Sequence, residues 1–305
     1  MGQKGVYLNL VGVDVQNKTR EELVTIFQEI LQSGIHGISF SAYGNDQKPG
    51  DQLSTDLIEE RMRIIQPYVK WVRSFSCTDG NEEIPRIAHE KGIKTMVGAW
   101  LGEEPDKNEN EIKNVIKVAN DGYADIVAVG NEVLLRKDLS LEALIDQINR
   151  VKNEIPDGIP VGYVDAYYVF DQYPDLVNVC DVILINCYPF WEGCSLEYSP
   201  LYLKGMHSIA EKCGQGKKII ISETGWPNKG SAVWGAEPSY EAALKYFIST
   251  CKWAEEENIE YFYFASFDEG WKIAAEGDVG AYWGIWDKDH NPKYVHGSWN
   301  YENDK

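Results

Sequence analysis

The sequence lacks any apolar run near 18 residues, and its mean hydropathy is −0.37, so it offers no candidate membrane span. It is also poor in positive charge, with 29 basic against 48 acidic residues and a formal net charge of −19. Such a surface repels a phosphate backbone instead of releasing its counterions. We therefore expect no nucleic-acid partner, whereas an uncharged ligand meets no such repulsion.

Several sequence motifs are absent as well. The chain contains no GxGxxG, GxxxxGK[ST], HExxH or GxSxG motif, and its five histidines are scattered. These absences argue against a dinucleotide fold, a P-loop, a zincin and a serine hydrolase. We expect no cofactor and no metal, although a metal held by distant acids stays open.

Six cysteines occur without any CxxC pair, so most are expected to be buried thiols, with one bridge such as Cys187 to Cys194 left open. The first residues do not form a signal peptide. We expect a monomer that is secreted, periplasmic or at the cell surface after removal of a signal; a cytoplasmic protein is the alternative.

Aromatic residues are plentiful, with 10 Trp and 18 Tyr, and several lie beside turn residues. Exposed aromatic rings form stacking surfaces for sugars and for bases. The acidic balance favours sugars.

Apolar segments recur every 20 to 40 residues, and segments with helical periodicity lie between them. Right-handed crossovers between eight parallel strands close a (β/α)8 TIM barrel. We predict one catalytic domain over residues 1–305, with 1–34 as a preceding segment and 280–305 as a tail packed on the barrel. The eight predicted strands are 37–43, 69–75, 93–100, 125–129, 161–164, 182–186, 219–222 and 261–267.

Two of these strands end in a glutamate. The sequence KKIIISETGWP places Glu223 at the end of strand seven, and DIVAVGNE places Glu132 at the end of strand four. A single glutamate of this kind could equally belong to a structural ion pair. Two of them at the active-site face of a barrel suit glycosidic bond cleavage, in which one acid donates a proton and the other attacks.

Three stretches of the sequence resemble those of a known family. The sequences AVGNEVL (128–134), ISETGWP (221–227) and FDEGWK (267–272) resemble the signature stretches of glycoside hydrolase family 17, the β-1,3-glucanases. The resemblance runs from about residue 37 to 293. It implies a retaining endo-β-1,3-glucanase acting on laminarin-like β-1,3-glucan, with Glu132 as acid/base and Glu223 as nucleophile.

The resemblance also implies supporting roles. Asn131 would bond the sugar 2-hydroxyl, or else is a turn residue; Tyr188 would donate to Glu223, or else packs in the core. Glu269 and Lys272 match an acidic and basic pair of the family. Gly270 stands where the family usually has proline, which loosens that turn.

The remaining candidates come from the residue pattern. Arg73 lies inside an apolar strand and needs a carboxylate partner, which is Glu223 or an acid elsewhere. Aromatic residues just past strand ends could stack on sugars or could belong to the core; they are Trp191, Trp226 and Trp271, with Tyr43 and Trp100 as outer candidates.

Two rival functions stay open. A β-1,3-glucanosyltransferase would use the same site with a sugar acceptor in place of water. A non-catalytic carbohydrate-binding barrel would have lost one of the two glutamates, and both are present.

Overall fold

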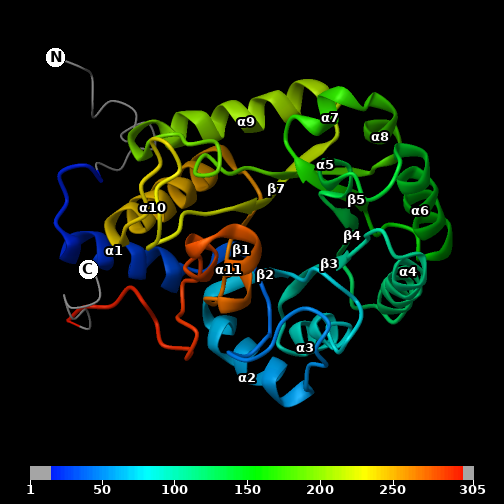
Figure 1. Cartoon of the computed structure of the whole chain (residues 1–305), viewed down its shortest axis with the longest axis horizontal. Helices are drawn as coiled ribbons and strands as arrows, with labels where there is room; N and C mark the ends of the chain where they lie inside the picture. Colours follow the sequence, from blue (N-terminus) through cyan, green and yellow to red (C-terminus); the bar gives the residue numbers. More distant parts are fainter. Residues whose placement is uncertain (1–14, 298–305) are drawn as a thin grey trace.

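The computed structural model describes residues 15–297, which form a closed barrel of eight parallel strands with helices around it (Figure 1). Each strand pairs with the next in the sequence, and β8 pairs with β1, so the predicted TIM barrel is confirmed. The strands are β1 (Ile35–Ser39), β2 (Val69–Arg73), β3 (Lys94–Ala99), β4 (Ile126–Asn131), β5 (Val161–Ala166), β6 (Val182–Asn186), β7 (Lys218–Thr224) and β8 (Tyr261–Tyr263).

The helices form the outer layer. They follow the local sequence signals: α6, for example, starts where the Ser140 hydroxyl accepts from the Ala143 N–H, and it buries Leu144, Ile148 and Val151 along one face. The helices are α1 (Arg20–Ser33), α2 (Thr55–Ile65), α3 (Glu83–Glu90), α4 (Pro105–Asn120), α5 (Val133–Arg136), α6 (Leu141–Glu154), α7 (Val169–Gln172), α8 (Pro174–Val179), α9 (Ser199–Cys213), α10 (Tyr240–Glu257) and α11 (Ile273–Glu276), with short 3-10 turns η1 (Gln66–Tyr68), η2 (Leu196–Tyr198), η3 (Gly270–Lys272) and η4 (Asp278–Ala281).

The segment before β1 belongs to this outer layer. Helix α1 packs against α10 and so completes the helical ring beside β8 and β1 (Figure 1). Phe27 on its buried face contacts Phe247 of α10, with the two ring centroids 4.6 Å apart. The part of the predicted preceding segment that precedes residue 15 lies outside the described residues.

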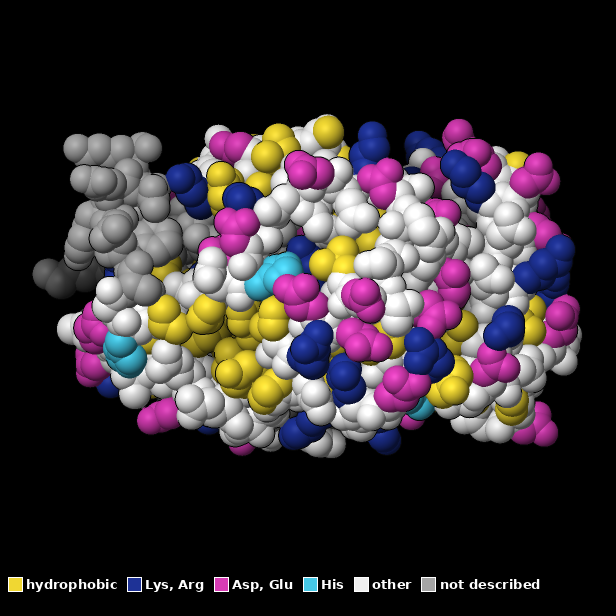
Figure 2. Space-filling view, turned by 90° about the horizontal axis from the view of Figure 1, so that it is seen from below, with side chains coloured by type: hydrophobic (Ala, Val, Ile, Leu, Met, Phe, Trp, Pro, Cys, Tyr) yellow, Lys and Arg dark blue, Asp and Glu magenta, His cyan; other side chains and the backbone are white. Residues whose placement is uncertain are grey.

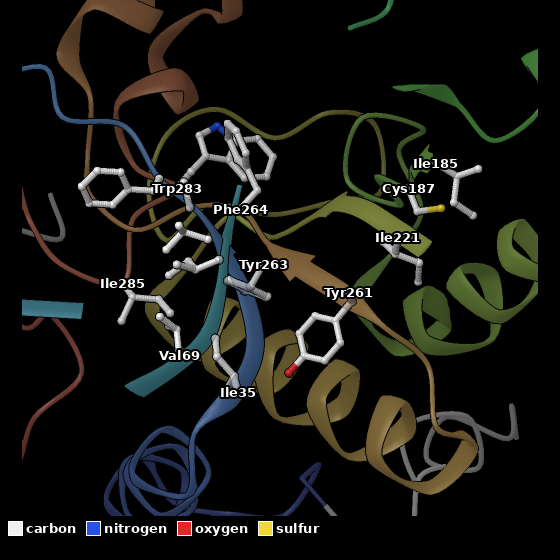
Figure 3. Packing of buried hydrophobic residues seen from close by; sticks show 14 of the residues in the cluster. Ile35, Val69, Ile185, Cys187, Ile221, Tyr261, Tyr263, Phe264, Trp283 and Ile285 are labelled. Carbon is white, nitrogen blue, oxygen red and sulfur yellow. The ribbon is translucent and has the colours of Figure 1, made fainter. Parts of the chain in front are cut away.

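Strand β8 is shorter than the predicted 261–267. Beyond Tyr263, Phe264 and Ser266 still donate to Thr224 and Ser39 of the neighbouring strands, but the residues between and after them bond to the tail. Ala265 donates its N–H to the Trp283 carbonyl at 3.0 Å, and Trp286 donates to the Ser266 carbonyl at 2.9 Å. Phe264 and Trp283 also pack together, with their ring centroids 5.7 Å apart (Figure 3). The tail therefore covers the end of β8, and its residues 298–305 lie outside the described residues.

A buried ion pair fixes the tail to this region. Lys293 Nζ lies 2.8 Å from Asp268 Oδ1, and the two side chains are 7% and 11% exposed. Burial raises the pKa of Asp268 and lowers the pKa of Lys293, and each charge opposes the shift of the other. Each charge thus offsets part of the cost of burying the other.

Lys293→Ala should therefore lower the free energy of unfolding by about 3 to 5 kcal/mol, since it leaves a buried carboxylate without its cation. Urea denaturation measures this change. The matched control is Lys288→Ala, which breaks the exposed pair with Asp289 and should cost less than about 1 kcal/mol. Equal losses in the two variants would show that the buried pair does not hold the tail.

The prediction that most cysteines are buried thiols is confirmed: all six are free, and four of them are buried. The bridge left open between Cys187 and Cys194 is not formed. Cys187 is fully buried (Figure 3), whereas the Cys194 thiol donates to the neighbouring Ser195 carbonyl.

The surface shows a mixture of charges. On the face in Figure 2, acidic and basic side chains are interspersed around one area of hydrophobic side chains.

No helix within residues 15–297 is long and apolar enough to cross a membrane. Nor do these residues contain a group of three or more His, Cys, Asp or Glu side chains placed to hold a metal ion.

Candidate active site

The two glutamates lie at the carboxyl ends of β4 and β7. Glu132 follows β4 directly and has a left-handed backbone, with φ of 53°. Gly130 also has a positive φ, 84°, and a Cβ there would lie 2.9 Å from a Val133 methyl group. The register between β4 and β5 shifts between Ala128 and Asn131, as in a β-bulge. This local distortion sets the direction in which Glu132 leaves the strand.

Glu223 is 6% exposed and is held by two donors. The Arg73 guanidinium forms a salt bridge with Oε1, and the Tyr188 hydroxyl donates to Oε2 at 2.6 Å. The same guanidinium donates to Asn131 Oδ1 at 2.7 Å. Arg73 therefore joins three strands, β2, β4 and β7, and its charge stabilises a negative charge on Glu223.

Glu132 has a different environment. Its Oε1 accepts from Asn186 Nδ2 at 2.8 Å, and Asn186 Oδ1 accepts in turn from the Ser222 hydroxyl at 2.8 Å. Burial raises the pKa of Glu132 to about 7, with a further contribution from the negative charge of Glu223. The site thus favours the protonated form of Glu132 below about pH 7, while cationic and phenolic donors face Glu223.

A third group of charges follows β8. Lys272 Nζ lies 2.5 Å from Glu269 Oε2, both side chains are buried, and the Trp271 indole donates to Glu269 Oε1 at 3.0 Å. The rings of Trp271 and Tyr43 also contact each other in a T-shaped arrangement. The turn with Gly270 in place of proline therefore still brings Glu269 and Lys272 together.

The aromatic candidates divide into three kinds. Trp226 is 1% exposed, and its indole donates to the Glu237 carbonyl, so the prediction that it stacks on sugar is wrong: it belongs to the core. Trp191 is partly buried against Trp283, with ring centroids 5.5 Å apart. Trp100 is 40% exposed, and the Arg136 guanidinium lies 4.7 Å from its ring centroid. Trp100 is therefore still accessible to solvent.

Three polar residues of this region were not predicted from the sequence. Asn186 ends β6, and the strand-end position that revealed the glutamates would have revealed it too. Asp165 is fully buried near the end of β5 and helps to raise the pKa of Glu132. Glu276 could not be found from the sequence pattern, because it lies in the short helix α11 and not at a strand end. Burial raises its pKa to about 7; the charge of Lys272 opposes that rise, and the charge of Glu223 adds to it.

A (β/α)8 barrel with paired glutamates after its fourth and seventh strands has the architecture of a glycoside hydrolase. The chain belongs to the BtgE/BtgC glycoside hydrolase domain family, whose model matches residues 37–284. The resemblance to family 17 and the prediction of a glycoside hydrolase are thereby confirmed.

Several known proteins are similar over most of their length. A "Glucan 1,3-beta-glucosidase" of Arthroderma benhamiae is 27% identical over 289 residues, which cover 87% of this chain and 91% of the relative. The solved family 17 β-1,3-glucanosyltransferase of Rhizomucor miehei is 27% identical, with a TM-score of 0.76 over 86% of this chain and 96% of that one. An endo-laminarinase from Formosa shares the fold, with 19% identity and a TM-score of 0.72 over 86% of each chain.

Proposed function

We propose that this chain hydrolyses internal β-1,3-glucosidic bonds of a laminarin-like glucan with retention of configuration. The observation that carries the proposal is the asymmetry of the two glutamates. Glu223 is paired with Arg73 and Tyr188, whereas burial raises the pKa of Glu132 to about 7. An ionised carboxylate beside a protonated one is the arrangement that a retaining glycosidase requires.

The chemistry proceeds in two displacements. Glu223 attacks the anomeric carbon while Glu132 gives its proton to the departing glycosidic oxygen, so an ester forms and the glucosidic bond breaks. Glu132, now ionised, takes a proton from water, whose oxygen displaces Glu223. Two inversions give net retention.

Neighbouring residues support these steps. Asn131, whose Oδ1 accepts from Arg73, would bond the 2-hydroxyl of the attacked glucose. Tyr188 and Arg73 hold Glu223 in its position, and Asn186 holds Glu132. Glu269, Trp271 and Lys272 follow β8, and Trp271 packs against Tyr43 from the segment after β1. Glu269 and Lys272 orient the substrate without taking part in bond cleavage.

A glucanosyltransferase is the second candidate. Its support is the family 17 β-1,3-glucanosyltransferase of Rhizomucor miehei, for which a complex with laminaritriose has also been solved. The two functions share the covalent intermediate and differ in the second step, because a sugar hydroxyl replaces water. Elongated products at high oligosaccharide concentration would identify transfer. Monomeric state and secretion stay predictions.

Laminarin, curdlan, lichenan and cellulose together test the substrate. We expect laminarin to be cut to short oligosaccharides and cellulose to stay intact, and chromatography of the released sugars measures this. Mainly internal cleavage predicts products of several lengths from the start; release of glucose alone would instead indicate an exo-acting enzyme. Cleavage of cellulose with laminarin untouched would overturn the substrate class.

The pH dependence follows from the two acids. Glu132 must carry a proton, so kcat/KM should fall as the pH rises through about 7. At low pH the rate should fall again, because Glu223 must be ionised. The plot of kcat/KM against pH should therefore be bell-shaped with a mildly acidic optimum. Its two apparent pKa values belong to the coupled pair of glutamates. A rate that still rises beyond pH 9 would argue against a carboxylic acid as the proton donor.

A further inference from the structure

The helical turn α5 follows Glu132 directly, and Glu132 is its N-cap residue. An N-cap side chain ordinarily accepts a hydrogen bond from the second or third N–H of its helix, as Ser140 does for α6. Glu132 makes no such bond, because its carboxyl group accepts from Asn186 in the candidate active site. The first N–H groups of α5 therefore need acceptors from another element.

Strand β5 supplies those acceptors. Helix α5 packs against β5 (Figure 1), and the Leu134 N–H donates to the Tyr163 hydroxyl at 2.9 Å. The Leu135 N–H bonds to Asp165, and the Tyr163 hydroxyl donates to Asp165 Oδ2. Both of these β5 side chains are fully buried. Asp165 thus holds the turn behind Glu132 directly and through the phenol of Tyr163.

The directions of these hydrogen bonds favour an ionised Asp165. The Tyr163 oxygen accepts from Leu134, so its own proton points to Asp165 Oδ2, and Oδ1 accepts from the Ala166 N–H at 2.8 Å. A carboxylate accepts from all of these donors without a competing proton of its own. Burial raises the pKa of Asp165, and the donors together with the charge of Arg136 oppose that rise.

The backbone of Glu132 is bound to the same strand. Its N–H donates to the Val164 carbonyl at 2.8 Å, and its carbonyl accepts from the Arg136 N–H at 2.8 Å. Its φ of 53° lies in the left-handed region, which costs free energy in a residue other than glycine. The contacts from β5 thus hold the acid in a backbone conformation that is unfavourable in itself.

Asp165 also acts on Glu132 through its charge. Burial raises the pKa of Glu132 to about 7, and the negative charges of Glu223 and Asp165 add to that rise. Asp165 therefore joins Glu223 in opposing ionisation of the acid. The titratable and charged groups around Glu132 include Glu223 of β7, Asp165 of β5, Arg136 of α5, and the phenols of Tyr168 and Tyr188.

We propose that Asp165 is a positioning residue for the proton donor: with Tyr163 it fixes the turn that follows Glu132, and its buried negative charge favours the protonated form of that glutamate. The inference rests on the proposed function for the role of Glu132 as acid/base. It adds that β5 keeps the proton on Glu132 until the glycosidic oxygen takes it. Asp165 acts through Glu132 and takes part in no bond change.

The first test compares the pH profile of wild type with that of Asp165→Asn, which removes the charge at nearly constant shape. The pH at which kcat/KM on laminarin falls on the basic side should decrease by roughly 0.5 to 1 unit, because loss of a nearby negative charge lowers the pKa of Glu132. Above pH 7 the rate should then be about three- to tenfold below that of wild type. The control is Asp157→Asn, which removes an exposed charge from the loop before β5 and should keep the wild-type profile.

Tyr163→Phe separates position from charge, because it removes the phenol and keeps the carboxylate. It should leave the basic side of the pH profile nearly in place and lower kcat/KM on laminarin by about three- to tenfold, since the turn behind Glu132 loses an acceptor. A dinitrophenyl glucoside needs no proton from Glu132. The ratio of kcat/KM on laminarin to kcat/KM on the aryl glucoside at pH 7 should therefore fall in both β5 variants.

NMR titration of carbon-13-labelled glutamate carboxyl groups reads Glu132 independently of turnover, with Glu132→Gln identifying its signal. A lower pKa of Glu132 in Asp165→Asn, with no change in Asp157→Asn, supports the proposal. An unchanged titration together with an unchanged pH profile in folded Asp165→Asn overturns it, while an active wild type upholds the proposed function.

Two further outcomes are distinguishable. A wild type that leaves every β-1,3-linked substrate intact defeats the proposed function, and the NMR titration alone then decides for or against Asp165. If circular dichroism shows that Asp165→Asn does not fold, Tyr163→Phe decides. A lower ratio of laminarin to aryl glucoside turnover in that variant supports the proposal, and a wild-type ratio overturns it.

Discussion

Glu223→Ala is expected to lower kcat/KM by roughly 10⁴-fold or more on laminarin and on activated aryl glucosides alike. Without this carboxylate no covalent intermediate forms, whatever the leaving group. Initial rates on both substrates measure the loss. Because Glu223→Ala also leaves the buried Arg73 without its carboxylate, Glu223→Gln should be measured beside it as the variant of unchanged shape.

The matched control is Glu142→Ala, which removes an exposed glutamate from α6 and should retain wild-type rates. Circular dichroism distinguishes lost chemistry from lost folding. A folded Glu223→Gln protein that keeps a substantial rate on the aryl glucoside would exclude Glu223 as the nucleophile.

Glu132→Ala should show a loss that depends on the leaving group. On laminarin, the missing proton donor should cost about 10²- to 10⁴-fold in rate. A dinitrophenyl glucoside needs no protonation of its leaving group, so the intermediate should still form and then persist for want of a base. Added azide needs no deprotonation and should restore turnover as the β-glycosyl azide.

The azide products also assign the two roles. The same addition to Glu223→Ala can give only an α-azide, through a single inversion. Proton NMR of the products reads the anomeric configuration. An α-azide from Glu132→Ala together with a β-azide from Glu223→Ala would mean that the roles are exchanged.

The barrel could be predicted from the sequence because its strands are buried on both faces. Strand β6 is a continuous apolar run, and its predicted bounds, 182–186, agree with the structure. Helix α10 likewise follows local signals, namely the apolar spacing of its residues and the Ser239 cap at its start. In contrast, the prediction extended β8 too far, because beyond Tyr263 the backbone bonds to the tail as well as to the neighbouring strands.

The candidate site, too, could be predicted from the sequence only in part. Glu132 and Glu223 follow apolar strands, so their positions in the sequence place both at one end of the barrel. Two other features depend on tertiary contacts that no local pattern encodes. Arg73 pairs with the end of β7, more than 100 residues away, and Trp226 is buried against Tyr246 of α10.

Covalent trapping tests the central claim most directly, namely that Glu223 forms the glycosyl-enzyme. A dinitrophenyl 2-deoxy-2-fluoro-β-laminaribioside combines a good leaving group with a fluorine that slows breakdown of the intermediate. Intact-protein mass spectrometry should show one added fluorinated disaccharide, and peptide mapping should place it on the segment that contains Glu223. A label on the peptide that contains Glu132, with that of Glu223 unmodified, would contradict the account.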